Sequence, residues 1–269
     1  MNRILFNMEM RRNVRSLFLW SLIIGVLIFF TMSFFRTVLQ YQKQIADMVN
    51  LVPVMAIKMR GFSNISDIFS VLGFYSANNI IYMMLLGSIY SIVLSSNILL
   101  KEESGKTAEY LMSRPISRHQ IFFTKVNLVF LNIFILNLFA TLVGFIAIQV
   151  YKTGSFNIHP FLVISLYTLL LNLLFGALGF FISVMMKRAR PITFFCVGLS
   201  LVLYFLYSIS KMSGVDGTFG YLSPFKWVNI DILSPSYGIE PWRVIAFVSM
   251  SATLILVSNF IYCRKDILT

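Results

Sequence analysis

The residues best suited to chemistry are gathered in one segment, residues 101–118, with the sequence KEESGKTAEYLMSRPISR. Seven of these eighteen residues are charged, in a chain of which only 12% is charged. Their types suggest two chemistries. Gly105-Lys106-Thr107 could hold a phosphate, and the adjacent carboxylates of Glu102 and Glu103 could act in acid–base or metal chemistry.

The possible phosphate site lacks most of its motif. A P-loop needs a glycine five residues before the Gly-Lys pair, and Leu100 occupies that position. It also needs a preceding strand, whereas this segment follows a long apolar run. We therefore expect no nucleotide site in this chain, and any ATP and magnesium must be held by another subunit.

The paired glutamates are superficially similar to those of the CAAX-processing membrane proteases. Such enzymes also need histidines in later membrane spans, but His119 and His159 lie at the edges of apolar runs, on opposite sides. A buried serine paired with histidine or lysine is also absent from the apolar runs. We expect no catalytic residue, no cofactor site and no metal site, and hence no enzyme.

Membrane spans are the elements that must position the 101–118 segment. The chain has 269 residues, of which 58% are hydrophobic, and its mean hydropathy is +0.82. This composition is typical of integral membrane proteins. About 20 apolar helical residues cross a bilayer. Six stretches qualify, so the expected fold is all-α, a single transmembrane domain over residues 1–269 with spans at about 16–35, 74–100, 121–150, 160–186, 192–210 and 244–263.

The basic residues predict the orientation. The net charge of +12 lies mostly at the ends of the apolar runs, which favours contact with lipid over nucleic acid. Placing both termini in the cytosol puts fourteen Lys and Arg residues inside and eight outside. We count Lys125 among the inside flanking residues. We therefore expect a multi-pass protein of the bacterial plasma membrane with both termini cytosolic.

The span interiors are expected to contain no Asp, Glu, Lys or Arg. Ion-coupled carriers usually place such groups inside their spans, so their absence argues against that class. The polar residues that remain there are asparagines, which suit hydrogen bonds between helices as well as substrate contact. These are Asn127, Asn132, Asn137 and Asn172.

Two long segments are expected outside. Residues 36–73 contain apolar residues suited to a helix on the outer surface. Residues 211–242 contain aromatic residues, including Tyr221, Phe225 and Trp242, among glycines and prolines. Aromatic anchoring at the headgroup level explains this second segment, and a gate over an outward exit is the alternative.

Within the charged segment, the sequence predicts a short helix. Residues 107–114 lack glycine and proline and contain good helix formers, and Pro115 ends the run. Ser117 followed by Gln120 has the spacing of a capping box and marks the start of the third span. The sequence therefore predicts about two turns of helix between Gly105 and Pro115, facing the cytosol.

The order of these residues resembles the cytosolic signature of type-2 ABC exporter permeases. That signature reads approximately E-x-x-x-G-T-x-E-x-L-x-S-x-P-[VI]-[ST]-R, and Lys106 stands as one inserted residue before Thr107. The matching positions are Glu102, Gly105, Thr107, Glu109, Leu111, Ser113, Pro115, Ile116, Ser117 and Arg118. Residues 9–16 are similar to the family's N-terminal elbow helix at the membrane interface, with Arg11, Arg12 and Arg15 as its basic cluster.

The resemblance implies the membrane subunit of an ATP-driven exporter. In that family the loop helix is a coupling helix, to which the ATPase docks. It implies two copies of an ABC ATPase and a second permease that is identical or related. The apolar, charge-free spans favour an amphipathic or hydrophobic substrate over a bare ion. The docking role also extends to Tyr110, Met112 and Arg114 within the loop. An ion-coupled secondary transporter and a non-transporting membrane scaffold are the alternatives.

Small residues mark two candidate packing ridges. Residues spaced by three or four along a span let another helix approach closely. The first ridge is Gly87, Ser91 and Ser95, and the second is Gly176, Gly179 and Ser183. The spacing leaves open whether these ridges pack within the subunit or against a second permease.

Overall fold

The computed structural model describes residues 3–50, 68–104, 117–186, 189–212 and 218–264. All regular elements in these ranges are helices, in agreement with the expected all-α fold. In order they are α1 (Arg3–Ser33), α2 (Phe35–Gln40), α3 (Gln42–Asn50), α5 (Val71–Asn79), η2 (Ile80–Leu86), α6 (Gly87–Ser104), α8 (Arg118–Tyr151), α9 (Ile158–Met185), α10 (Ala189–Met212), η3 (Thr218–Leu222), η4 (Pro224–Trp227) and α11 (Pro241–Arg264).

Within the described residues, six helical stretches are long and apolar enough to cross a bilayer. They are Ile4–Gln40, Val71–Leu100, Arg118–Tyr151, Ile158–Met185, Pro191–Lys211 and Pro241–Arg264. Helices suit this role because a bilayer core offers no hydrogen bonds, and a helix pairs its own backbone groups. Each expected span except the first has bounds within three residues of these stretches.

The first span is much longer than expected. It was expected at about 16–35, but α1 runs unbroken from Arg3 to Ser33. The segment resembling an elbow helix is thus the beginning of α1, and the structure differs here from the separate interfacial helix we expected. The reason is local: residues 3–24 contain no glycine or proline to break the helix.

Helix ends follow ordinary capping chemistry. Ser117 caps α8 by accepting a hydrogen bond from the Gln120 backbone, at 3.3 Å, which confirms the predicted role of this pair. Asn157 caps α9 in the same way, accepting from the His159 backbone at 3.0 Å. Pro241 is the first residue of α11, where its missing N–H is not needed.

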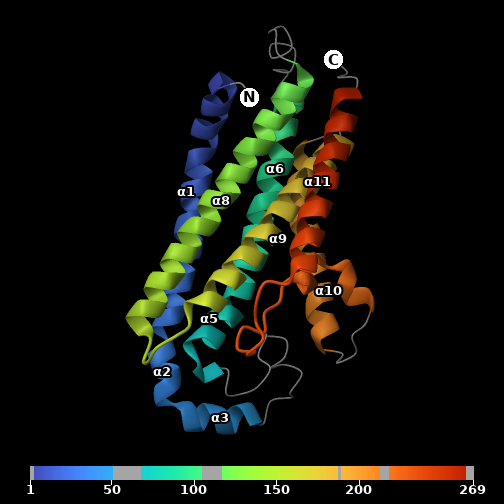
Figure 1. Cartoon of the computed structure of the whole chain (residues 1–269). Helices are drawn as coiled ribbons and strands as arrows, with labels where there is room; N and C mark the ends of the chain where they lie inside the picture. Colours follow the sequence, from blue (N-terminus) through green and yellow to red (C-terminus); the bar gives the residue numbers. More distant parts are fainter. Residues whose placement is uncertain (1–2, 51–67, 105–116, 187–188, 213–217, 265–269) are drawn as a thin grey trace.

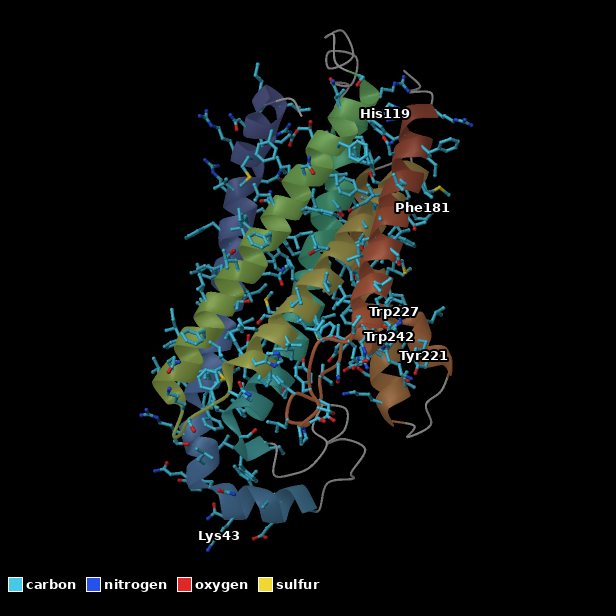
Figure 2. All side chains as sticks on the ribbon, viewed as in Figure 1. Lys43, His119, Phe181, Tyr221, Trp227 and Trp242 are labelled. Atoms are coloured by element: carbon cyan, nitrogen blue, oxygen red, sulfur yellow. The ribbon has the colours of Figure 1, made fainter. Side chains whose placement is uncertain are left out.

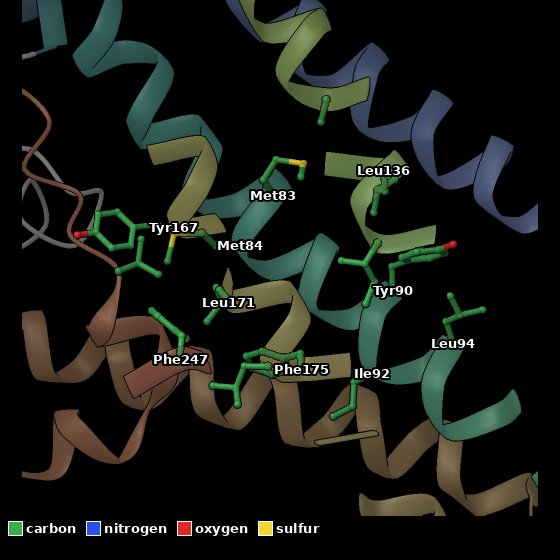
Figure 3. Close-up of a cluster of buried hydrophobic side chains, with 14 of the residues drawn as sticks. Met83, Met84, Tyr90, Ile92, Leu94, Leu136, Tyr167, Leu171, Phe175 and Phe247 are labelled. Carbon is green, nitrogen blue, oxygen red and sulfur yellow. The ribbon is translucent and has the colours of Figure 1, made fainter. Parts of the chain in front are cut away.

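The helices form one bundle around α6 and α9, which pack along each other through its middle (Figure 1). On this central pair, α10 packs against α6 and α11 against α9, while α1 packs mainly on α8. A cluster of buried side chains from several of these helices fills the interior, including Met84, Leu136 and Leu171 (Figure 3). The start of α1 and the end of α11 lie at one end of the bundle, called the termini end below. Helix α3 lies across the opposite end, called the α3 end.

Candidate functional site

The charged segment joins the end of α6 to the start of α8, at the termini end. Residues 101–104 form the last turn of α6, so Glu102 lies on that helix. Residues 105–116 are outside the described residues, and so is the predicted two-turn helix with most of the signature. The site is therefore built from the residues that anchor the two helices on either side.

The start of α8 is tied to the end of α11. The Arg118 guanidinium donates to the backbone carbonyl of Cys263 at 3.4 Å. The His119 ring lies 3.1 Å from the Asn259 carboxamide oxygen and 3.4 Å from the Cys263 sulfur. Figure 2 shows His119 at the termini end of α8. A displacement of Arg118 would therefore act on α11 as well as on α8.

Lys125 ties α8 to α6. Its side chain is only 1% exposed, and its ammonium donates to the backbone carbonyl of Ile98 at 2.7 Å. The expectation that the spans contain no charged residue is therefore wrong at this position. The sequence alone groups Lys125 with the flanking residues, but α8 begins at Arg118, so Lys125 lies two turns inside the helix and faces the bundle.

The basic residues near the start of α1 face outward. Arg11, Arg12 and Arg15 are exposed, as suits contact with headgroups. Glu9 is buried, with its carboxylate 3.3 Å from the Arg12 guanidinium. The Asn13 carboxamide donates to the Glu9 backbone carbonyl at 2.9 Å. Sequence reasoning missed the inward-facing set formed by Glu9 and Asn13.

The two small-residue ridges lie at contacts within the chain. A side chain added at Gly179 would collide with Ser95 and with the backbone of Ile92, so α9 and α6 approach closely here. Gly176 faces α8, where an added Cβ would lie 2.8 Å from a methyl of Ile133.

The serines of these ridges are all buried. Ser91 donates to the Gly87 carbonyl at 2.7 Å, and Ser95 to the Ser91 carbonyl at 2.9 Å, so both hydroxyls bond within α6. Ser183 is 2% exposed, and its hydroxyl has no hydrogen-bond partner among the described residues. The face formed by Gly87, Ser91 and Ser95 is therefore a contact surface inside the subunit.

A π-helix interrupts the second span, and asparagines from two other helices hold it. In η2 the backbone pairing is shifted by one residue, which turns carbonyls away from the regular ladder. Asn172 of α9 donates to the Met83 carbonyl of η2 at 3.3 Å and to the Asn137 carboxamide of α8 at 3.2 Å. An added Cβ at Gly87 would lie 2.7 Å from the Asn172 carboxamide. These bonds confirm the expected interhelical role for Asn137 and Asn172.

The segment before α11 packs onto the bundle. Phe225 is fully buried, 5.2 Å from the Phe175 ring and 5.8 Å from Tyr204 between ring centres. The Ser223 hydroxyl donates to the Leu203 carbonyl at 2.7 Å. Phe225 is therefore a core residue and not the interfacial anchor we expected, whereas Tyr221 and Trp242 remain exposed near the start of α11 (Figure 2).

Glu240, at the end of this segment, accepts three side-chain hydrogen bonds. Its carboxylate accepts from the Arg243 guanidinium at 2.8 Å, the Trp242 indole at 2.9 Å and the Asn229 carboxamide at 3.2 Å. Burial raises the pKa of Tyr237 above its ordinary value, so the hydroxyl stays protonated and donates to the Asn229 carbonyl at 3.0 Å. These bonds hold the segment together and tie it to the start of α11, while the Glu240 backbone N–H donates to the Tyr167 hydroxyl of α9 at 2.8 Å.

Among the described residues, no group of three or more His, Cys, Asp or Glu side chains is arranged to hold a metal ion. His119 and His159 lie at the starts of α8 and α9, which point in opposite directions along the bundle (Figure 1). The arrangement joins helices mechanically: α6, α8 and α11 are cross-linked near the termini end by the Lys125 and Arg118 bonds.

Comparison with known protein families identifies a match over most of the chain. A family model described as ABC-2 family transporter protein matches residues 3–263, nearly the whole chain. A search of curated proteins finds no match.

Proposed function

The chain belongs to the ABC-2 family of transporter proteins and is a multi-pass membrane permease subunit; we propose that it serves an exporter driven by a separate ATPase. The family match over residues 3–263 is the observation that carries this proposal. We further propose that the whole chain acts as one permease domain in a bacterial plasma membrane, with both termini in the cytosol.

We propose that the ATPase docks on residues 101–118, with Glu109 to Arg118 as the coupling helix. The contacts on either side support this role. A force on this segment acts directly on the end of α6 and the start of α8. It reaches α11 through the Arg118 bond to Cys263, and the Lys125 bond to Ile98 holds α6 and α8 together. Three spans would therefore respond as one body.

In the proposed complex, two ATPase subunits bind ATP and magnesium and close. Each draws a coupling helix with it, and the spans of two permeases move to favour an outward-open state. The second permease is identical or related to this chain. An amphipathic or hydrophobic substrate suits the apolar helices, and the exporter signature of residues 102–118 supports the outward direction.

The test is charge reversal in the coupling segment. Glu109→Lys and Arg118→Glu should abolish substrate-stimulated ATP hydrolysis when the permease is reconstituted with its ATPase in vesicles. Asp47→Lys is the matched control, because Asp47 is exposed on α3 at the other end of the bundle. Wild-type stimulation in both coupling variants, with normal insertion, would refute the docking assignment.

An ion-coupled carrier is the second candidate, and Lys125 is the observation that favours it. An ionisable group buried in a span often marks an ion pathway. Its bond to a helix backbone fits a structural tie as well, and the two roles separate in vesicles. Transport that requires ATP and continues after the ion gradients are collapsed supports the exporter. Transport that persists without ATP and stops when the gradients are collapsed supports the carrier.

A further inference from the structure

A cavity with a mixed polar and apolar lining lies between the beginning of α1 and residues 90–98 of α6, so its α6 side ends about one turn before the 101–118 segment. Its volume is about 210 Å³. A single buried water needs only about 10–15 Å³ on this kind of measure, so the cavity can hold an organic group. Its polar and aromatic lining comes from Glu9, Arg12, Asn13, Trp20, Tyr90 and Asn97.

Two buried polar groups in this lining are poorly satisfied by the chain itself. Tyr90 is 2% exposed, and its hydroxyl has no hydrogen-bond partner among the described residues. Glu9 is 5% exposed, and its one ion-pair partner among them is Arg12, at 3.3 Å. Charge-assisted hydrogen bonds are usually about 2.7–2.9 Å long, and a buried charge needs close partners. Both groups therefore leave room for a ligand.

The chemistry of the lining selects a ligand with two opposite charges. The Glu9 carboxylate suits an ammonium group, and the same lining contains the rings of Trp20 and Tyr90, which pack against each other at 5.7 Å between ring centres; aromatic rings also favour cations. The Arg12 side chain is 56% exposed and so can turn toward a phosphate at the rim. In Figure 3 the Tyr90 hydroxyl points away from the buried cluster, which leaves it available as a donor.

The position of the cavity indicates a lipid as the source of this ligand. The lining crosses the point in α1 where the basic residues, which end at Arg15, give way to the apolar run from Leu17 onward. Headgroups meet a spanning helix at such a transition. We propose that the cavity binds the headgroup of an amine-bearing phospholipid, with its ammonium at Glu9 and its phosphate at Arg12 and Tyr90.

The proposal is tested on the purified permease alone, so its outcome does not depend on any ATPase. Phosphatidylethanolamine, phosphatidylcholine and phosphatidylglycerol with the same acyl chains are titrated, and bound lipid is counted by native mass spectrometry. Phosphatidylethanolamine should bind at least about tenfold more tightly than the other two. Phosphatidylcholine keeps the cation but has no N–H to donate to Glu9, and phosphatidylglycerol has no amine.

Two variants test whether the lipid binds in this cavity. Glu9→Gln removes the charge with little change of shape, and Tyr90→Phe removes only the hydroxyl. Each should weaken phosphatidylethanolamine binding severalfold, whereas Asp47→Asn on the exposed α3 should not. The melting temperature reports folding, and if Glu9→Gln does not fold, Tyr90→Phe carries the test.

Three results would overturn the proposal. The first is equal binding of the three lipids. The second is phosphatidylethanolamine binding that is unchanged in every folded lining variant. The third is soluble phosphoethanolamine competing as well as the lipid does, since the cavity would then draw its ligand from solution.

Discussion

Lys125 places an ammonium group in the apolar contact between α8 and α6. Burying a cation there is costly unless it is well paired. The Ile98 carbonyl supplies a partner at 2.7 Å, and it lies toward the C-terminal, negative end of the α6 dipole. Removing the ammonium would remove its desolvation cost, and the Ile98 carbonyl that it bonds would still lie within a helix. The tie between the two helices would be lost with little loss of stability.

Lys125→Met tests this tie, because methionine keeps the length of the side chain without its charge. We expect the melting temperature to stay the same or rise, since an apolar group replaces a buried charge. Substrate-stimulated ATP hydrolysis should fall about fivefold or more, which corresponds to the loss of ~1 kcal/mol of coupling free energy. Asn127→Met, on the exposed face of α8, is the matched control. Normal stimulation together with a lower melting temperature would mean that Lys125 serves stability alone.

The roles of some of these residues can be predicted from the sequence and those of others cannot, for physical reasons. Ser117 was predictable as a cap because its partner, Gln120, lies three residues away. Lys125 was not, because basic residues also flank spans, and only the true start of α8 shows that it lies inside. Glu9 likewise lies among arginines in the sequence, and the α6 residues that line the same cavity, such as Tyr90, are distant along the chain.

At the scale of elements, the π-helix η2 and the asparagines that hold it form a joint in the second span. Asn172→Leu would remove the donor to the Met83 carbonyl and to the Asn137 carboxamide oxygen in an apolar interior. We expect a loss of about 1–3 kcal/mol of stability, seen as a lower melting temperature in detergent. Asn137→Leu should add little to this loss, because both residues belong to one network.

Asn127→Leu is the control for this pair, since that asparagine is exposed on α8. It should leave the melting temperature unchanged. Fully additive losses in the double variant would show that Asn172 and Asn137 do not act together.

The contact between α6 and α9 gives a second prediction at this scale. Gly179→Ala should destabilise the bundle by about 1–3 kcal/mol, because the new methyl meets the α6 backbone at Ile92. Gly198→Ala on α10 is the matched control, since an added Cβ there meets nothing within 4 Å and alanine favours a helix. Thermal unfolding compares the two, and equal melting temperatures would contradict the close packing of α6 on α9.

The elements differ in how far the sequence predicts them. Apolar runs and their polar ends locate the spans well, because bilayer thickness sets the length. The spacing of Gly176 and Gly179 predicts close approaches but not the neighbours, since it fixes a face of α9 and not its partner. The η2 segment, IIYMMLL, is apolar throughout, so no periodicity reveals its shifted pairing.

At the scale of the molecule, the outer surface matches a bilayer. Large apolar side chains are exposed along α1, α10 and α11, as on Phe30, Phe205 and Leu256. In water such a surface would aggregate, whereas lipid tails accommodate it. The distribution of basic residues predicts that the termini end lies in the cytosol, which is the side on which we propose that the ATPase docks.

Cysteine labelling tests this orientation directly. Ser117 is exposed at the termini end, and Ser155 is exposed in the turn between α8 and α9 at the α3 end. In a Cys263→Ser background, a membrane-impermeant thiol reagent added to intact cells should label Ser155→Cys but not Ser117→Cys. After permeabilisation both introduced cysteines should react, since neither position is buried. The native Cys196 is buried and should not contribute to the labelling. Labelling of Ser117→Cys in intact cells would place the 101–118 segment outside, where no ATPase could reach it, and the exporter proposal would fall with it.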